Sequence, residues 1–170
     1  MFTQALCFLL LLALVALAKA DKQWAEGYMS ALGDKEKVLA LLNSTTGGPY
    51  TYSQSKHHFT GMGFDGTMID TYGACSGAAG SCRNNPSCQC QVSVGPLPQG
   101  TYTLGNMQDF HGMPYCYVLY PDAGNNMCGR SGFLIHGGGC SGDPSEGCIV
   151  IEDENIRYKI KSGATLKVVG

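Results

Sequence analysis

The chain has 170 residues, with 11 Lys and Arg against 13 Asp and Glu, which gives a formal net charge of −2. This length is enough for one domain with its own core, and a hydrophobic content of 44% excludes the composition of disordered chains. Only 14% of the residues are charged and no run of Lys or Arg occurs, so we expect no nucleic-acid partner.

Residues 1–20 have the features of a cleaved secretory signal peptide. Every residue from Ala5 to Ala18 is apolar, and the run ends in Ala18-Lys19-Ala20, a small-x-small cleavage pattern. An apolar run of this length is too short to cross about 30 Å of hydrocarbon. We therefore expect a secreted, extracellular protein without membrane contact after cleavage.

The cysteines then favour a disulfide framework. The signal peptide removes only Cys7 of the nine cysteines, and eight in an oxidising compartment most simply form disulfides, whose pairing the sequence leaves open. A zinc site is the alternative because Cys82, Cys88 and Cys90 lie close together, but their spacing fits no paired C-x-x-C pattern. We expect disulfides, and no metal or cofactor.

Residues 21–49 are predicted to form a short helical appendage and a linker. Apolar residues from Trp24 to Leu42 recur at an intermittent helical spacing, which predicts two short helices broken at Gly33-Asp34. Residues 43–49 are rich in Gly, Ser and Thr and read as the linker. Asn43 opens an N-glycosylation sequence within it.

Residues 50–170 are predicted to form a mainly β domain. Short β-prone runs alternate with Gly, Asn, Pro and Asp, a pattern typical of a sandwich or barrel. The strands are expected at Tyr50–Tyr52, Gly66–Tyr72, Gly100–Leu104, Tyr115–Tyr120, Gly132–His136, Cys148–Ile151, Ile156–Ile160 and Thr165–Val169. Residues 75–90 lack apolar periodicity and contain four cysteines, so we expect a cross-linked surface loop there.

The segment from His136 to Cys148 has the residues for nucleophilic chemistry. An apolar run ending in His136 and a glycine tract predicts a strand that presents an imidazole to a loop carbonyl, which leaves one ring nitrogen free as a base. Gly147-Cys148 then predicts a thiol at a tight turn before another strand. A Cys deprotonated by a His performs acyl transfer through a thioester. The alternative is that Cys148 is half of a disulfide and His136 an ordinary strand-end histidine.

Three motifs in one order resemble the YkuD-type L,D-transpeptidases, above all the branch of effectors delivered by bacterial secretion systems. His136-Gly137 followed by Ser145-x-Gly147-Cys148 looks like the active-site signature of that family. Residues 94–102 are similar to its Gly-Pro-x-Pro-x-Gly-x-Tyr segment, and residues 129–133 to the segment leading to its His. The resemblance covers residues 50–151 and implies an L,D-transpeptidase-like sandwich or barrel.

The resemblance implies that Cys148 is the nucleophile and His136 its general base. It also implies that Ser145 and Gly147 shape the turn, that the Gly137 carbonyl orients the imidazole and that Arg130 supports the site or binds a substrate carboxylate. The implied substrate is a peptidoglycan stem peptide, attacked at the L-centre of its third residue with release of a terminal D-amino acid. Water as acceptor would give L,D-carboxypeptidase activity, and an amine would give transpeptidation or exchange.

Departures from the family pattern and a second hypothesis remain. Glu146 stands where many members have a second His. A free Cys148 leaves an odd number of other cysteines, and Cys140 is the expected unpaired one. A Cys140–Cys148 disulfide would make the protein latent or inactive.

The alternative function is a disulfide-rich, non-catalytic binding module, which predicts that all eight mature cysteines are oxidised. The remaining histidines, at positions 57, 58 and 111, are expected to face solvent or lie in loops. We expect a monomer, with an antibacterial role if the wall belongs to foreign bacteria.

Overall fold

The computed structural model describes residues 47–142 and 145–170. The predicted signal peptide, the two predicted helices and the Asn43 sequence lie outside the described residues. The described part belongs to one compact unit. No helix within these two ranges is long and apolar enough to span a membrane.

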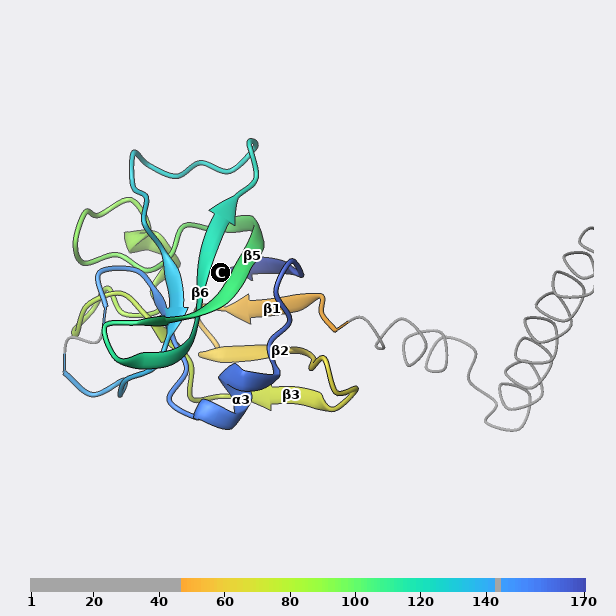
Figure 1. The fold of residues 1–170 in the computed structure, drawn as a ribbon. Coiled ribbons are helices and arrows are strands. Elements are labelled where there is room, and N and C mark those ends of the chain that lie inside the picture. The colour runs from red at the N-terminus through yellow and green to blue at the C-terminus, as the bar shows by residue number, and fades with distance from the viewer. Residues whose placement is uncertain (1–46, 143–144) are drawn as a thin grey trace, which may run out of the picture. The chain divides into compact units, whose positions relative to one another are not determined.

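The described strands form one curled sheet in the order β3-β2-β1-β9-β5-β6-β7-β8-β4. Figure 1 shows the sheet extending from β3, beside the helix α3, up to the β5–β6 hairpin. The pairs β1–β9 and β7–β8 are parallel, and the other pairs are antiparallel. The prediction of a mainly β domain is confirmed. The elements are β1 Tyr50–Ser53, β2 His58–Met62, β3 Met68–Thr71, β4 Cys75–Ser76, the 3₁₀ helix η1 Pro86–Cys88, β5 Gly100–Phe110, β6 Met113–Pro121, β7 Leu134–His136, β8 Ile149–Val150, α3 Glu154–Lys159 and β9 Thr165–Val169.

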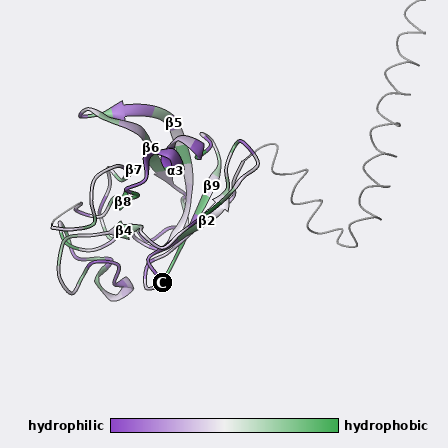
Figure 2. Ribbon diagram, turned by 90° about the horizontal axis from the view of Figure 1, so that it is seen from below, coloured by the Kyte–Doolittle hydropathy of each residue, from purple (hydrophilic) through white to green (hydrophobic). Residues whose placement is uncertain are grey.

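Tyrosines provide much of the core volume, because four of them stand at inward-facing strand positions: Tyr50, Tyr52, Tyr102 and Tyr117. Their hydroxyl groups find partners inside the protein, as buried tyrosines require. Tyr102 donates to the Pro98 carbonyl at 2.6 Å, and the Tyr117 hydroxyl lies 2.9 Å from the Arg157 carbonyl oxygen. The far half of β5 leaves the core and becomes hydrophilic, as Figure 2 shows. Residues 106–110 are exposed accordingly.

The predicted strand at Ile156–Ile160 is wrong, because this segment lies largely in α3. Asp153 caps the helix by accepting a hydrogen bond from the Asn155 amide at 2.8 Å. An acidic residue in the first turn and two basic residues in the last turn favour a helix through its dipole. Ile156 and Ile160 face the core at the i, i+4 spacing of a helix.

Two strands escaped prediction, and the surface loop expected at residues 75–90 is partly wrong. In β2 only Phe59 is fully buried, and Gly61 interrupts the β-prone pattern. β4 has only two residues, both buried against β8, so this part of the segment belongs to the sheet. Asn84 is buried too, and its side-chain oxygen accepts from the Ser76 amide at 2.7 Å.

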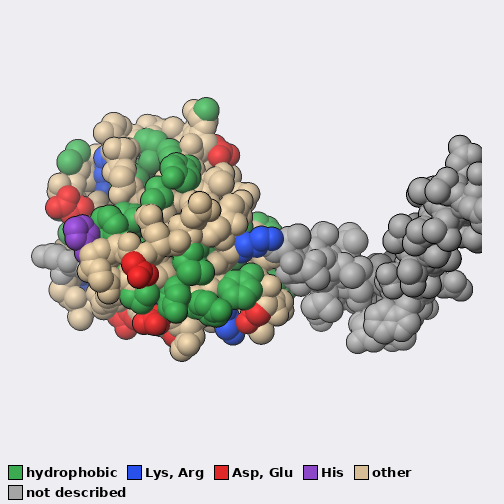
Figure 3. Space-filling model, viewed as in Figure 1, with side chains coloured by type: hydrophobic (Ala, Val, Ile, Leu, Met, Phe, Trp, Pro, Cys, Tyr) green, Lys and Arg blue, Asp and Glu red, His purple; other side chains and the backbone are tan. Residues whose placement is uncertain are grey.

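α3 packs against β6 through aromatic contacts on the protein surface. The Tyr158 ring lies edge-to-face with Phe64 at 5.4 Å and with Tyr115 at 5.2 Å between ring centroids. Figure 3 shows hydrophobic side chains gathered on the part of this face where Figure 1 places α3 and β3. This packing fixes α3, which carries Arg157 toward the end of β7.

Candidate active site

Three disulfides leave two thiols unpaired among the eight cysteines of the described residues. The free thiols are Cys116, which is buried in β6, and Cys148. The expectation that Cys140 is unpaired is wrong, and so is the Cys140–Cys148 disulfide, because folding brings β4 next to the loop that follows β7. Such disulfides are typical of an oxidising compartment. The pairs are Cys75–Cys140, Cys82–Cys88 and Cys90–Cys128.

Cys148 and His136 lie on the same face of two adjacent strands. In the parallel β7–β8 ladder Ile135 pairs with Ile149 and His136 with Val150, so Cys148 comes opposite Leu134. The Leu134 amide accordingly contacts the Cys148 Sγ at 3.4 Å. Since side chains alternate between faces, the imidazole and the thiol are diagonal neighbours on the face opposite the buried isoleucines.

The imidazole is held in the form that acts as a base. Nδ1 of His136 lies 2.6 Å from the Gly137 carbonyl oxygen. A carbonyl oxygen only accepts hydrogen bonds, so Nδ1 carries the proton and Nε2 has a free lone pair. Among residues 47–142 and 145–170, no hydrogen bond occupies Nε2 or joins the imidazole to the Cys148 thiol.

The turn before Cys148 is fixed by two serine hydroxyls. The Ser145 hydroxyl donates to the Cys148 carbonyl at 2.8 Å and accepts from the Gly147 amide at 3.4 Å. The Ser76 hydroxyl donates to the Gly147 carbonyl at 2.9 Å. Gly147 has a φ of +128°, and a Cβ there would lie 2.7 Å from the Phe133 ring. The turn therefore requires glycine.

Arg130 is buried beside this turn and supports the surrounding loops. The guanidinium also lies 5.0 Å from the centre of the Phe133 ring. Because four N–H···O bonds engage both terminal nitrogens, the geometry favours a supporting role, and only Nε is left for a substrate carboxylate. The acceptors are the carbonyl groups of Gln89 at 2.5 Å, Pro96 at 2.7 Å, Gly95 at 2.8 Å and Glu146 at 2.7 Å.

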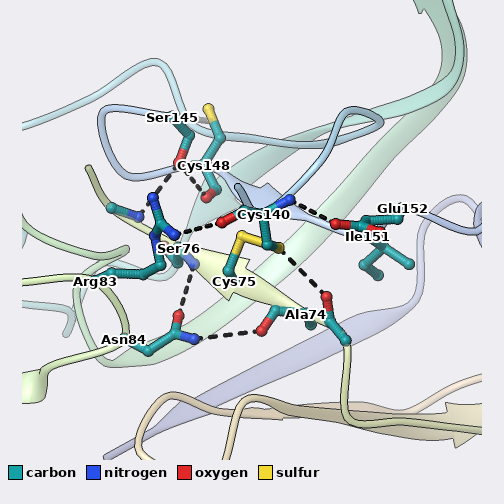
Figure 4. The surroundings of a disulfide bond; sticks show 12 residues. Ala74, Cys75, Ser76, Arg83, Asn84, Cys140, Ser145, Cys148, Ile151 and Glu152 are labelled. Atoms are coloured by element: carbon teal, nitrogen blue, oxygen red, sulfur yellow. Dashed lines mark hydrogen bonds between the residues drawn. A yellow bond between two sulfur atoms is a disulfide. The ribbon is translucent and has the colours of Figure 1, made fainter. Parts of the chain in front are cut away.

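The other two arginines of the chain also hold loop carbonyls near the site, which sequence reasoning missed. Arg83 donates to the Cys140 carbonyl in the loop between His136 and Cys148 (Figure 4), and also to the Gly142 carbonyl in that loop. Arg157 donates to the Ile151 carbonyl at 2.7 Å. Loops leave many carbonyls without a backbone partner, so buried guanidinium groups stabilise them. The one feature of the sequence that could have pointed to Arg83 and Arg157 is that the chain has only three arginines.

Both thiols are harder to ionise than an exposed cysteine. Burial is the main cause of the raised pKa of Cys148. The Leu134 amide and Arg130 oppose the shift, whereas Cys116 and, to a smaller extent, Glu146 add to it. Burial likewise raises the pKa of Cys116. Cys148 is therefore a thiol at neutral pH, and its ionisation requires a base. Figure 4 shows its sulfur pointing away from the Cys75–Cys140 disulfide.

The Cys148 thiol borders a cavity that could receive a peptide. This cavity has a volume of about 260 Å³ and is also lined by Arg130, Phe133 and Glu146. A second cavity of about 480 Å³ shares Ser93 and Glu146 with it. In the described part of the chain, no group of three His, Cys, Asp or Glu side chains is arranged to hold a metal ion.

The remaining histidines lie elsewhere. His58 is on β2, which four strands separate from β7 in the sheet, and its Nε2 lies 2.5 Å from Asp70. Its ring stacks on Tyr72 with 4.2 Å between ring centroids. His57 and His111 are exposed in turns. Of the four histidines, only His136 lies on a strand adjacent to β8, which Cys148 directly precedes.

The comparison with protein-family models agrees with the motifs found in the sequence. Residues 70–169 match the sequence model of the Tlde1 domain. The fold is similar to the LD transpeptidase LdtMt1, solved in complex with imipenem (17% identity, TM-score 0.44), over 71% of the chain and 57% of that protein. It is also similar to an L,D-transpeptidase from Mycobacterium smegmatis (17% identity, TM-score 0.42), over 71% of the chain and 58% of that protein. The chain thus spans less than three fifths of the length of either solved structure. The search of curated proteins found no match to its sequence. Since the match covers more than half of its length, the chain belongs to the Tlde1 domain family, and the predicted relationship to secretion-system L,D-transpeptidase effectors is confirmed.

Proposed function

We propose that the chain is a secreted cysteine enzyme that acts on peptidoglycan stem peptides, as an L,D-carboxypeptidase, an L,D-transpeptidase or both. One observation carries the proposal. Cys148 stays a thiol although six of the other seven mature cysteines form disulfides. It borders a cavity, and it directly precedes β8, whose neighbour β7 ends in His136 with a free Nε2. The Tlde1 family membership supports the substrate class.

The proposed reaction begins with proton transfer from the Cys148 thiol to Nε2 of His136. The raised pKa of Cys148 makes this base necessary. The thiolate attacks the carbonyl carbon of the third stem residue, and the imidazolium donates its proton to the amine of the leaving D-amino acid. The peptide then remains on Sγ as a thioester.

In the second half of the reaction the thioester is transferred to an acceptor. His136 removes a proton from water or from an acceptor amine, which attacks the thioester carbonyl. The tetrahedral intermediate collapses, and Sγ leaves and regains a proton. Water gives the shortened stem peptide, and an amine gives a new amide bond. Gly137 orients the base, and Ser145 and Gly147 hold the turn, through the contacts described above.

The experiment combines thiol mapping with turnover. The unreduced protein is alkylated with iodoacetamide and mapped by peptide mass, and a second sample is incubated with a tetrapeptide muropeptide. We expect alkylated Cys148 and release of the terminal D-amino acid. Cys148→Ala should have no turnover, and His136→Ala should be about 10²–10⁴-fold slower. Wild-type turnover in either variant would overturn the mechanism.

The alternative binding module predicts that all mature cysteines are oxidised, whereas Cys116 and Cys148 are unpaired in the structure. It would gain support if Cys148 were found only in a disulfide and no turnover followed mild reduction. We further propose that the enzyme works as a monomer, without metal or cofactor, on the walls of other bacteria. Loss of viability in bacteria that export the wild-type chain, and survival with Cys148→Ala, would test this role.

A further inference from the structure

Glu146 occupies the junction of the two cavities beside Cys148. It lines both of them and is exposed. Within the described ranges, its carboxylate makes no hydrogen bond and no ion pair; only its backbone carbonyl is engaged, by Arg130. A carboxylate therefore faces the groove with no protein partner.

The positive charge of Arg130 attracts this carboxylate, but in the described residues no hydrogen bond or ion pair joins the two side chains. Arg130 is the one cationic side chain that lines either cavity in the described part of the chain, and both its terminal nitrogens are engaged by backbone carbonyls. The rest of the lining is glycine, hydroxyl and apolar side chains: Val92, Ser93, Gly129, Ser131, Gly132, Phe133, Ala78, Ala79, Val94 and Ser145. Arg130 therefore has no terminal N–H left for the Glu146 carboxylate, which keeps its hydrogen-bond acceptors for a group bound in the groove.

Glu146 is poorly suited to assist the nucleophile. Its negative charge makes the smallest contribution to the raised pKa of Cys148, after burial and Cys116, so it slightly disfavours the thiolate on which the reaction depends. A charge that opposes thiolate formation is better explained by a favourable contact with the substrate. A positively charged group bound there would supply that contact and offset the effect of the carboxylate on the thiol.

We infer that Glu146 is a specificity-determining residue that binds an ammonium group of the substrate. The inference deepens the proposed function and rests on it. The ammonium has two possible sources: the side-chain amine of the stem residue whose carbonyl is attacked, or the amine of the acceptor. Both would approach Cys148 along the groove that Glu146 divides.

The first experiment measures binding without turnover. A stem tetrapeptide with lysine at position three, and the same peptide with Nε-acetyllysine, are titrated into Cys148→Ala by calorimetry at low salt. We expect the free amine to bind about five- to tenfold more tightly, between the values for exposed and for desolvated ion pairs. Adding Glu146→Gln should abolish the preference. The matched control, Glu154→Gln, removes one exposed carboxylate from α3, outside both cavities, and should retain it.

The second experiment addresses the acceptor. Exchange of the terminal residue by a free D-amino acid is followed in otherwise wild-type protein. An acceptor role predicts a KM for the D-amino acid several-fold higher in Glu146→Gln than in the control Glu154→Gln. The inference is overturned if Glu146→Gln changes neither the lysine preference nor the acceptor KM in an enzyme that turns over. A chain that binds the amine through Glu146 but never turns over would instead refute the proposed enzyme.

Discussion

Loss of the Cys75–Cys140 disulfide is expected to reduce both stability and activity. The bond spans a sequence separation of 65 residues, whereas Cys82–Cys88 spans 6. Closing a loop in the unfolded chain restricts it more when the loop is longer, which gives about 4 kcal/mol for the long loop and about 2 kcal/mol for the short one. Removing the long-range bond should therefore destabilise the protein by about 2 kcal/mol more.

The comparison uses two double variants, Cys75→Ala/Cys140→Ala and Cys82→Ala/Cys88→Ala. Urea unfolding followed by far-ultraviolet circular dichroism gives the free energy of unfolding of each variant relative to the wild type. The short-loop variant is the matched control because it also replaces two cysteines. An equal or larger loss of stability in that control would refute the entropic reasoning.

The same bond also positions the loop between His136 and Cys148. Cys140 lies in this loop, and its amide donates to the Glu152 carboxylate at 2.6 Å (Figure 4). Without the disulfide, Cys140 keeps the hydrogen bonds to Arg83 and Glu152 but loses its covalent anchor, so kcat should fall at a temperature where the variant stays folded. The short-loop variant should keep its kcat. Unchanged kcat in both variants would show that the loop needs no covalent anchor.

Three further predictions concern the site itself. Gly147→Ala should lower the free energy of unfolding by about 2–4 kcal/mol, because backbone strain and a clash of the new Cβ combine. Gly138→Ala, at a φ of +111° with open space around its Cβ, should lower it by about 1 kcal/mol in the same assay. Equal losses in the two variants would contradict the clash. In His136→Ala, the alkylation rate of Cys148 should increase with pH, with a midpoint above the pKa of an exposed cysteine. The reason is that burial raises the pKa of Cys148, so less thiolate is present at any lower pH. A midpoint below the pKa of an exposed cysteine would refute this. Cys116→Ala should lose about 1–2 kcal/mol of stability from a small core cavity and keep full turnover; loss of turnover in the folded variant would give Cys116 a role that the mechanism lacks.

Local patterns were enough to predict most of the sheet. Runs such as Thr165–Val169 alternate inward and outward residues, and this two-residue period shows in the sequence. The prediction failed at Ile156–Ile160 because the spacing of Ile156 and Ile160 fits one face of a strand and, as an i, i+4 pair, one face of a helix. The capping residue Asp153 favours the helix. β4 has only two residues, too few to show a period.

The site was only partly predictable. His136 and Cys148 could be proposed because their motifs are local, and the parallel β7–β8 ladder places them on one face. The disulfide partner of Cys140 could not be inferred, because it lies 65 residues away and depends on how β4 pairs with β8. Arg83 and Arg157 act through backbone carbonyls, and such contacts leave no motif in the sequence.

The most direct test of the central claim is to trap the acyl-enzyme. The protein is mixed with a tetrapeptide muropeptide, quenched in acid within the first turnovers and digested for peptide mass analysis. The account predicts the tripeptide acyl group on Cys148 and release of the terminal D-amino acid, both absent in Cys148→Ala and both present in Cys116→Ala. Turnover that persists in Cys148→Ala, or an acyl group found on Cys116 instead, would contradict it.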